Sequence, residues 1–201
     1  MKTLGLTGGV GMGKSACAQL LGARRVPVVD TDELARQVVE PGQPALAEVR
    51  QAFGAKIIGP DGRLCRDALA HQVFADPAAR LRLEAILHPP IRRLWRAWME
   101  AWRVEGQPLA VVVIPLLFET RAEEELDATL CVACSAATQR ARLLARGWSE
   151  DQLAQRLAAQ WPIERKLSLA RYVIWTEATL EVHAAQLDRI LRRLSAAPRS
   201  P

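Results

Sequence analysis

Five short apolar runs, separated by segments with helical periodicity, dominate the pattern of this chain. Each run is short enough for a buried strand, and the strongest holds three consecutive valines between residues 111 and 113. The expected strands are residues 1–7, 25–30, 109–115, 128–134 and 171–175. Because strands and helices alternate, the pattern predicts an α/β fold around a parallel sheet of about five strands.

The segment between the second and third strands is too long for a single crossover. It carries helical patterns at 33–40, 44–53, 66–74 and from 77 onward. His88-Pro89-Pro90 is expected to break or kink the last of these, because proline has no N–H group for the helix ladder. We expect residues 33–104 to form a helical substrate lobe.

The rest of the chain also shows clear helix signals. Ser135 is expected to cap a helix that Gly147 ends, and Ser149 with Gln152 forms a capping box for the next helix. The last helix carries an apolar stripe, which predicts its buried face. That stripe consists of Leu180, Ala184, Leu187, Leu191 and Leu194.

Residues 8–15 read G-x-x-x-x-G-K-S, the phosphate-binding P-loop, between the first strand and a helix. Glycines there let the backbone wrap a phosphate with its N–H groups turned inward. Lys14 can reach the β- and γ-phosphates of a nucleotide, and the Ser15 hydroxyl can ligate Mg²⁺. A dinucleotide-binding pattern fails, because Lys14 and Ala16 stand where it needs glycine.

Acidic residues follow two of the expected strands. Asp30 and Asp32 come at the end of the second strand, and Glu119 lies past the third, which Pro115 must end. Ligands of open α/β sheets bind at the carboxyl ends of the strands. We expect these acids near the P-loop, although one aspartate could cap the next helix and Glu119 could be an ordinary loop acid.

Composition narrows the class of protein. The chain has 201 residues and a net charge of +5. Its longest apolar run, residues 109–118, is half the length of about 20 needed for a membrane span. No secretory signal is apparent, so we expect a soluble cytoplasmic protein. Cys131 and Cys134 have C-x-x-C spacing, but a strand would turn them to opposite faces, which argues against a metal or redox role.

The basic residues concentrate in one stretch. Residues 138–171 hold seven basic side chains against three acids. A pair of arginine-rich helices between the fourth and fifth strands is typical of a lid that closes over phosphates. No N-K-x-D guanine signature occurs. A compact chain with an early P-loop, a helical insertion and such a lid indicates a small-molecule kinase.

The sequence resembles the dephospho-CoA kinase family over about residues 4–174. The matching segments are Leu6-Thr7-Gly8-Gly9 with the P-loop, Val28–Asp32, Ala35–Gly42, Phe53-Gly54, Asp61-Gly62, Leu87-His88-Pro89, Pro115–Glu119, Gln139 with Arg142 and Arg146, Arg156 with Gln160, and Lys166. The A-R-Q-V-V-E-P-G segment alone separates this family from adenylate and shikimate kinases.

The resemblance implies that ATP phosphorylates the ribose 3′-hydroxyl of dephospho-CoA, the last step of coenzyme A synthesis. It implies one dephospho-CoA kinase domain over 1–201: a nucleoside-monophosphate-kinase-like core (1–32, 105–137, 167–195), a CoA-binding lobe (33–104) and a lid (138–166). Its partners would be ATP, Mg²⁺ and dephospho-CoA, without nucleic acid or membrane, and the chain would be a monomer or a weak oligomer.

Roles follow for particular residues. Lys14, Asp32, Arg142 and Arg146 would be catalytic, with Asp32 orienting the hydroxyl and accepting its proton. The nucleotide would contact Gly8, Gly9, Val10, Gly11, Met12, Gly13, Lys14, Ser15 and Ala16. The acceptor would contact Asp32, Arg36, His88, Phe118 and Glu119, and Ser15 would hold the metal. His88 could instead only shape the helix break.

Two positions depart from the family pattern. Ala16 stands where the family usually has threonine, and Trp175-Thr176 replaces an Asp-Asn pair, which leaves any adenine contact from that loop open. Two alternatives remain: a kinase of another nucleoside or small alcohol, and an ATP-dependent nucleic-acid-binding protein that uses the basic surface.

Overall fold

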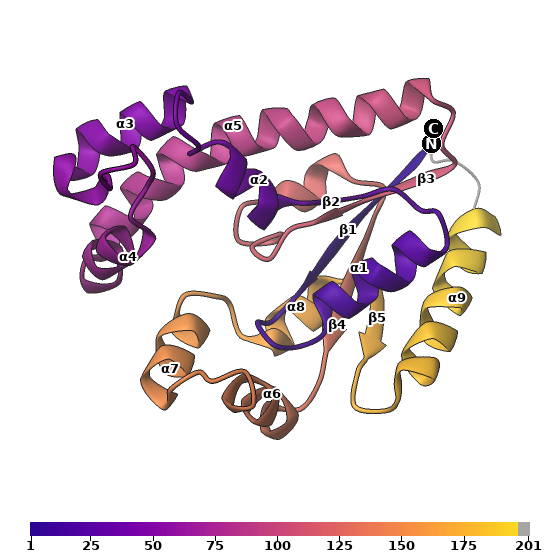
Figure 1. Ribbon diagram of the computed structural model, residues 1–201. Helices are drawn as coiled ribbons and strands as arrows, with labels where there is room; N and C mark the ends of the chain where they lie inside the picture. The colour runs from indigo at the N-terminus through magenta and orange to yellow at the C-terminus, as the bar shows by residue number, and fades with distance from the viewer. Residues whose placement is uncertain (197–201) are drawn as a thin grey trace. The chain divides into compact units, whose positions relative to one another are not determined.

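The structure is a computed structural model that describes residues 1–196, apart from the side chains of residues 74 and 75. A five-stranded sheet runs in the order β2-β3-β1-β4-β5 (Figure 1). Its strands are β1 (Lys2–Gly8), β2 (Val28–Asp30), β3 (Leu109–Val113), β4 (Ala128–Ala133) and β5 (Tyr172–Trp175). The pairings of β1 with β3 and β4, and of β4 with β5, are parallel, which confirms the predicted sheet.

The central position of β1 determines where the P-loop lies. β1 runs between β3 and β4, and its last residue, Gly8, pairs with Val132. The chain therefore leaves the carboxyl end of the middle strand, forms the loop and enters α1 (Lys14–Ala23). This is the edge at which parallel α/β sheets bind ligands.

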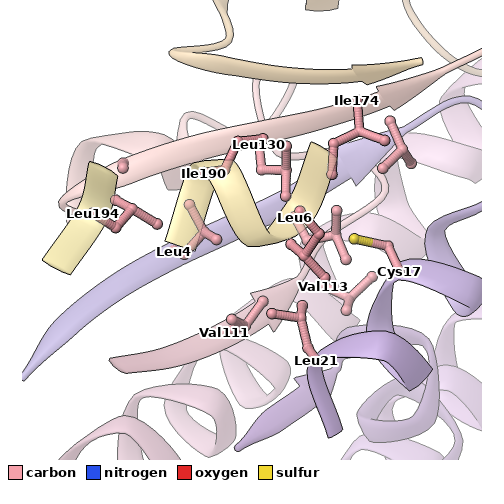
Figure 2. Close-up of a cluster of buried hydrophobic side chains, with 13 residues drawn as sticks. Leu4, Leu6, Cys17, Leu21, Val111, Val113, Leu130, Ile174, Ile190 and Leu194 are labelled. Carbon is pink, nitrogen blue, oxygen red and sulfur yellow. The ribbon is translucent and has the colours of Figure 1, made fainter. Parts of the chain in front are cut away.

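Alternate residues of the strands form the main core, shown in Figure 2. Leu4 and Leu6 on β1 point to the same side, because successive side chains of a strand alternate. They pack with Leu21 of α1 and with Leu187 of α9 (Leu180–Ala196), and all four are completely buried. Burial of this apolar surface holds α1, and with it the P-loop, against the sheet.

The opposite face is covered by other segments. Gly5 lies on that face beside Leu117 and Leu126, where an added Cβ would come within 2.7 Å of a leucine methyl. A short turn, η2 (Ala122–Glu125), precedes β4. Helix α8 (Ile163–Leu169) packs on β4 and adds Ile163 to a small cluster with Met12 of the P-loop. This face therefore contacts the P-loop as well.

The chain divides into two compact units. The first comprises Met1–Val29 and the chain from Trp102 onward, and the second comprises Asp30–Ala101. The second unit holds α2 (Thr31–Gln37), α3 (Pro44–Phe53), η1 (Ala55–Ile57), α4 (Arg66–Ala75) and most of α5 (Pro77–Val104). It has its own apolar clusters, one around Val49, Ile57 and Leu69.

Two expectations about helices are met only in part, because no break occurs at Pro89 and Pro90 and the buried face of the last helix is shifted. Helix α5 continues through Pro89 and Pro90 without interruption, although each proline lacks the N–H group of the ladder. Helix α9 buries Leu187 and Leu194 of the predicted stripe, but it also buries His183 and Ile190, and Leu180 is 55% exposed. The predicted stripe is thus wrong at its start, because His183 reads as polar in the sequence.

The segment predicted to form a lid contains the helices α6 (Ala136–Leu144) and α7 (Glu150–Ala158). Ser135 caps α6, and the capping box of Ser149 and Gln152 is present at α7, as predicted. Gly147 adopts a left-handed conformation just after α6 and ends it. Within residues 1–196, the apolar stretches of the helices are too short for any of them to cross a membrane.

Candidate active site

The P-loop needs glycine where it leaves β1 and where it enters α1. Gly8 has φ of 147°, and a Cβ there would lie 2.2 Å from the carbonyl oxygen of Val132. Gly13 has φ of 101° and caps α1 in the left-handed region, which favours glycine. The loop can therefore approach its neighbours closely and still direct its backbone toward a ligand.

Two side chains from distant segments orient the peptide groups of the loop. Gln139 Nε2 in α6 donates to the carbonyl of Val10 at 2.7 Å, and Thr176 Oγ1 donates to the carbonyl of Met12 at 3.0 Å. Because C=O and N–H of a trans peptide point in opposite directions, the N–H groups of Gly11 and Gly13 point away from Gln139 and Thr176. N–H groups fixed in this way form the anion-binding nest that a phosphate requires.

Lys14 lies across the loop. Its ammonium donates to the carbonyls of Gly8 at 2.7 Å and Gly9 at 2.9 Å. These acceptors are neutral, so a phosphate oxygen is a stronger partner for the same ammonium. Ser15 follows in the first turn of α1 and is exposed, so its hydroxyl can reach a ligand.

Arg142 is held against the loop that follows β5. Its Nη1 donates to Thr176 Oγ1 at 2.9 Å, and its Nη2 donates to the carbonyl of Thr176. Thr176 also donates its N–H to Ala133 at the end of β4, at 2.8 Å. Arg146 lies beyond the end of α6 and is exposed. Thr176 thus contacts the P-loop, strand β4 and helix α6.

A buried histidine lies near this arginine. His183 is 4% exposed, and within residues 1–196 its Nε2 has no hydrogen-bond partner. Burial lowers the pKa of His183, and the charge of Arg142 lowers it further. The imidazole is therefore held neutral beside the arginine.

The cysteines of the C-x-x-C segment are buried free thiols. Burial raises the pKa of Cys131 to about 11, although the charges of Lys166 and Lys14 oppose this. Among the described residues no group of three or more His, Cys, Asp or Glu side chains could hold a metal ion. The hydroxyl of Ser15, together with the oxygens of a bound phosphate, offers the kind of oxygen ligands that magnesium prefers.

Glu119 is largely buried beyond the end of β3, at the same sheet edge as the P-loop. Its Oε1 accepts from Lys166 Nζ at 2.8 Å and from the backbone N–H of Trp161 at 3.0 Å. Its Oε2 is buried and has no hydrogen-bond partner in the described part of the chain. The neighbouring Phe118 is 3% exposed, so direct contact with a substrate would require a change in its exposure.

The remaining predicted site residues belong to the second unit. Asp30 Oδ1 accepts from the N–H of Asp32 at 2.8 Å, so Asp30 is the helix cap and Asp32 is exposed in the first turn of α2. Arg36 is exposed in the last turn of the same helix. His88 is half-buried on α5, and its pKa is lowered by burial and by Arg92, with Glu84 acting in the opposite direction.

Sequence reasoning gave no structural role to three residues that the structure places in the site. Gln139 and Lys166 appeared only as matches to a family pattern, and Thr176 appeared only as a departure from it. Each acts through a contact with a residue at least 50 positions away, which no local pattern reveals. At Lys166 the neighbours Glu164, Arg165 and Ser168 are themselves polar, so the sequence gave no signal of its burial.

A P-loop on the central strand of a parallel sheet, ending in Lys-Ser and faced by an arginine-bearing helix, defines a P-loop kinase. The comparisons with known proteins specify which kind. A family model of dephospho-CoA kinase matches residues 2–181. Dephospho-CoA kinase of Anaeromyxobacter dehalogenans is 47% identical over 96% of this chain and 92% of its own length. Dephospho-CoA kinase of Bdellovibrio bacteriovorus is 41% identical over 96% of both chains.

A solved structure has the same fold. TT1252 from Thermus thermophilus aligns with a TM-score of 0.82 and 37% identity over 96% of this chain and 97% of that one. The chain belongs to the dephospho-CoA kinase family. It is an ATP-dependent kinase that acts on dephospho-CoA in the final step of coenzyme A biosynthesis.

Proposed function

We propose that this chain transfers the γ-phosphoryl group of ATP to the ribose 3′-hydroxyl of dephospho-CoA at the P-loop. The observation that carries the proposal is a pair of hydrogen bonds to the loop. Gln139 donates to the carbonyl of Val10, and Thr176 donates to the carbonyl of Met12. These bonds leave the N–H groups of Gly11 and Gly13 directed to the opposite side. Phosphoryl transfer depends mainly on such positioning and on charge stabilisation.

Cationic side chains supply the charge. Lys14 exchanges the carbonyls of Gly8 and Gly9 for the β- and γ-phosphates when ATP binds. Arg146, exposed after α6, then closes over the transferred group with Arg142 and excludes water from it. Arg142 also has a second role, which is to hold the lid helix α6 next to the P-loop through its contact with Thr176.

Acceptor roles are proposed residue by residue. Asp32 orients the 3′-hydroxyl and accepts its proton, and Arg36 and His88 contact dephospho-CoA. Phe118 and Glu119 contact it once they become exposed, with Glu119 Oε2 accepting a hydrogen bond from the substrate. Mg²⁺ neutralises phosphate charge when bound, and Ser15 Oγ is its proposed protein ligand.

We place the enzyme in the cytoplasm as a monomer without a nucleic-acid partner. Its cysteines are free thiols within the described residues, which suits a reducing compartment. Size-exclusion chromatography with light scattering tests the monomer, and insensitivity of kinase activity to added RNA or DNA tests the absence of a nucleic-acid partner.

A parallel assay of acceptors tests the function. The purified protein is given ATP and Mg²⁺ with dephospho-CoA, adenosine, AMP or shikimate, and ADP release is followed for each. We expect ADP release with dephospho-CoA and with none of the other three acceptors. The product should be identified as coenzyme A by chromatography. Faster turnover with another acceptor would refute the assignment.

The role of Asp32 can be tested by Asp32→Asn. The amide keeps the shape of the side chain but cannot take the proton, and a positioned base contributes ~10²–10⁴ in rate. We expect kcat to fall at least tenfold, with the KM for ATP unchanged. A matched control is Asp61→Asn, a loop carboxylate of the same unit that is bound to its own turn. More than a third of the wild-type kcat in Asp32→Asn would rule out this role.

A further inference from the structure

Lys166 is an unusual residue of α8 because its side chain is completely buried. It is 0% exposed, and its ammonium lies 2.7 Å from the carbonyl oxygen of Pro115 and 2.8 Å from Glu119 Oε1. Lysine is almost never fully buried unless it is paired. Apolar side chains of similar volume usually stabilise a fold at least as well as such a pair. Stability alone therefore does not explain a buried charge at this position.

The carboxylate of Glu119 fixes the segment at which the chain returns from the lid. Oε1 accepts hydrogen bonds from the N–H of Trp161 and from the ammonium of Lys166. One oxygen therefore binds both a residue just before α8 and a residue within it. The guanidinium of Arg165 stacks 3.3 Å from the centre of the Trp161 ring. Residues 161–166 are thus attached to Glu119 at two points.

The same ammonium connects this segment to the strand that carries the P-loop. The carbonyl of Pro115, which accepts from Lys166, also accepts from Thr7 Oγ1 at 3.2 Å. Thr7 is the residue before Gly8, where the P-loop starts. A continuous set of contacts therefore runs from Trp161 through Glu119, Lys166 and Pro115 to Thr7.

The other end of the lid segment is also attached to the loop. Gln139 and Arg142 hold α6 to Val10 and to Thr176, whereas α7, which lies between the two attachments, buries only Leu153. The stretch between α6 and Trp161 is therefore held at both ends, whereas its middle is joined to α6 by exposed contacts such as the Arg140–Glu150 ion pair.

We propose that Lys166 is a positioning residue for phosphoryl transfer. With Glu119 it fixes the return segment of the lid to the strand end beside the P-loop, and so determines where α7 and Arg146 lie over the transferred phosphate. Lys166 acts through Glu119 and Pro115 rather than by touching substrate. The proposal rests on the kinase function above.

The test compares Lys166→Met, Glu119→Gln and the double variant. Lys166→Met keeps the length of the side chain but leaves a buried carboxylate without its cation, so both the melting temperature and kcat should fall. Glu119→Gln keeps an oxygen for Trp161 and Lys166 but leaves the buried ammonium without its anion, so its melting temperature should fall as well. In the double variant no buried charge remains, and the melting temperature should recover.

Kinetics of the double variant separate positioning from simple stability. A 1 Å misplacement of a reacting group can cost ~10²-fold in rate, so we expect kcat of the double variant to stay at least tenfold below that of Glu119→Gln, which lacks the same carboxylate, although the fold is stable. The KM for ATP should stay within threefold of wild type. The ratio of ADP formed to coenzyme A formed should rise, because a misplaced lid admits water to the phosphate.

A matched control is Glu124→Gln, which removes the charge of an exposed ion pair with Arg121 in the same connection. It should leave kcat and the product ratio unchanged. Recovery of kcat together with the melting temperature in the double variant would overturn the proposal and leave Lys166 as a structural residue. Failure of the wild-type enzyme to form coenzyme A would instead overturn the function, so the two failures are distinguishable.

Discussion

The hydroxyl of Thr176 connects the P-loop with Arg142 of α6. It is 4% exposed, donates to the carbonyl of Met12 and accepts from Arg142. The first bond fixes a peptide of the P-loop, and the second fixes an arginine of the lid helix. Removal of the hydroxyl alone should therefore act on nucleotide binding rather than on the fold.

Thr176→Val tests this role, since valine has the shape of threonine without the hydroxyl. It leaves the Met12 carbonyl and one N–H of Arg142 without their partner, and each such bond contributes about 1 kcal/mol. We expect the KM for ATP to rise about tenfold, with kcat changed less than threefold. The control is Thr120→Val, whose hydroxyl bonds only to Leu116 in its own turn. A KM within twofold of wild type would show that Thr176 does not orient the loop.

His183 predicts a dependence of stability on pH. Burial and Arg142 lower its folded-state pKa below the ordinary 6.5, so the unfolded chain binds a proton more readily. The stabilisation from the neutral imidazole is present above pH 6.5 and is lost as the pH falls toward the folded-state pKa. Stability should therefore decrease between pH 7.5 and 5.5.

His183→Leu removes this titration and extends the buried face of α9. The measurement is the free energy of unfolding in urea at pH 7.5 and 5.5 for both proteins. The variant should lose less stability than wild type over this interval. Equal losses at acidic pH would exclude His183 as the responsible group.

At the scale of elements, strands were easier to predict than helix faces. The valines at 111–113 and the glycines of the P-loop report on burial and backbone conformation directly, so the sheet and the position of the loop followed from local patterns. The face of α9 did not, because His183 is polar in the sequence and buried in the fold. The roles of Thr176 and Lys166 depend on tertiary contacts, and no spacing rule encodes these.

Strand β5 poses a separate problem, because it lies at the edge of the sheet. Val173 and Trp175 are 42% and 44% exposed, and an open edge invites pairing with another chain. Gln186 of α9 satisfies the backbone of Trp175 on both sides: its Oε1 accepts the N–H at 3.0 Å, and its Nε2 donates to the carbonyl at 2.9 Å. The amide side chain thus takes the place of a neighbouring strand.

Gln186→Leu should expose that edge. The variant loses both bonds to Trp175 and adds an apolar side chain beside the exposed strand. We expect increased self-association, seen by light scattering at rising protein concentration, with the kinase activity of the monomer retained. Gln19→Leu, on the exposed face of α1, adds the same apolar group away from the edge and should scatter like wild type. Equal scattering of the two variants would contradict protection by Gln186.

At the scale of the whole molecule, the two units should respond differently to nucleotide. The P-loop belongs entirely to the unit of Met1–Val29 and the chain from Trp102 onward, whereas Asp30–Ala101 has its own apolar core. A ligand stabilises only the structure that binds it, by about 2.7 kcal/mol at one hundred times its Kd. Nucleotide should therefore raise the unfolding temperature of the P-loop unit most.

Calorimetry with a non-hydrolysable ATP analogue and Mg²⁺ measures this response. For a chain of this size, that stabilisation corresponds to a shift of about 5–10 °C. Lys14→Met removes the ammonium that bridges Gly8 and Gly9 and would bind the phosphates, so its shift should be less than a third of that of wild type. Lys56→Met, in the second unit, should keep the full shift. A full shift in Lys14→Met would mean that the nucleotide binds elsewhere, because the P-loop without its lysine loses the cation that faces the phosphates.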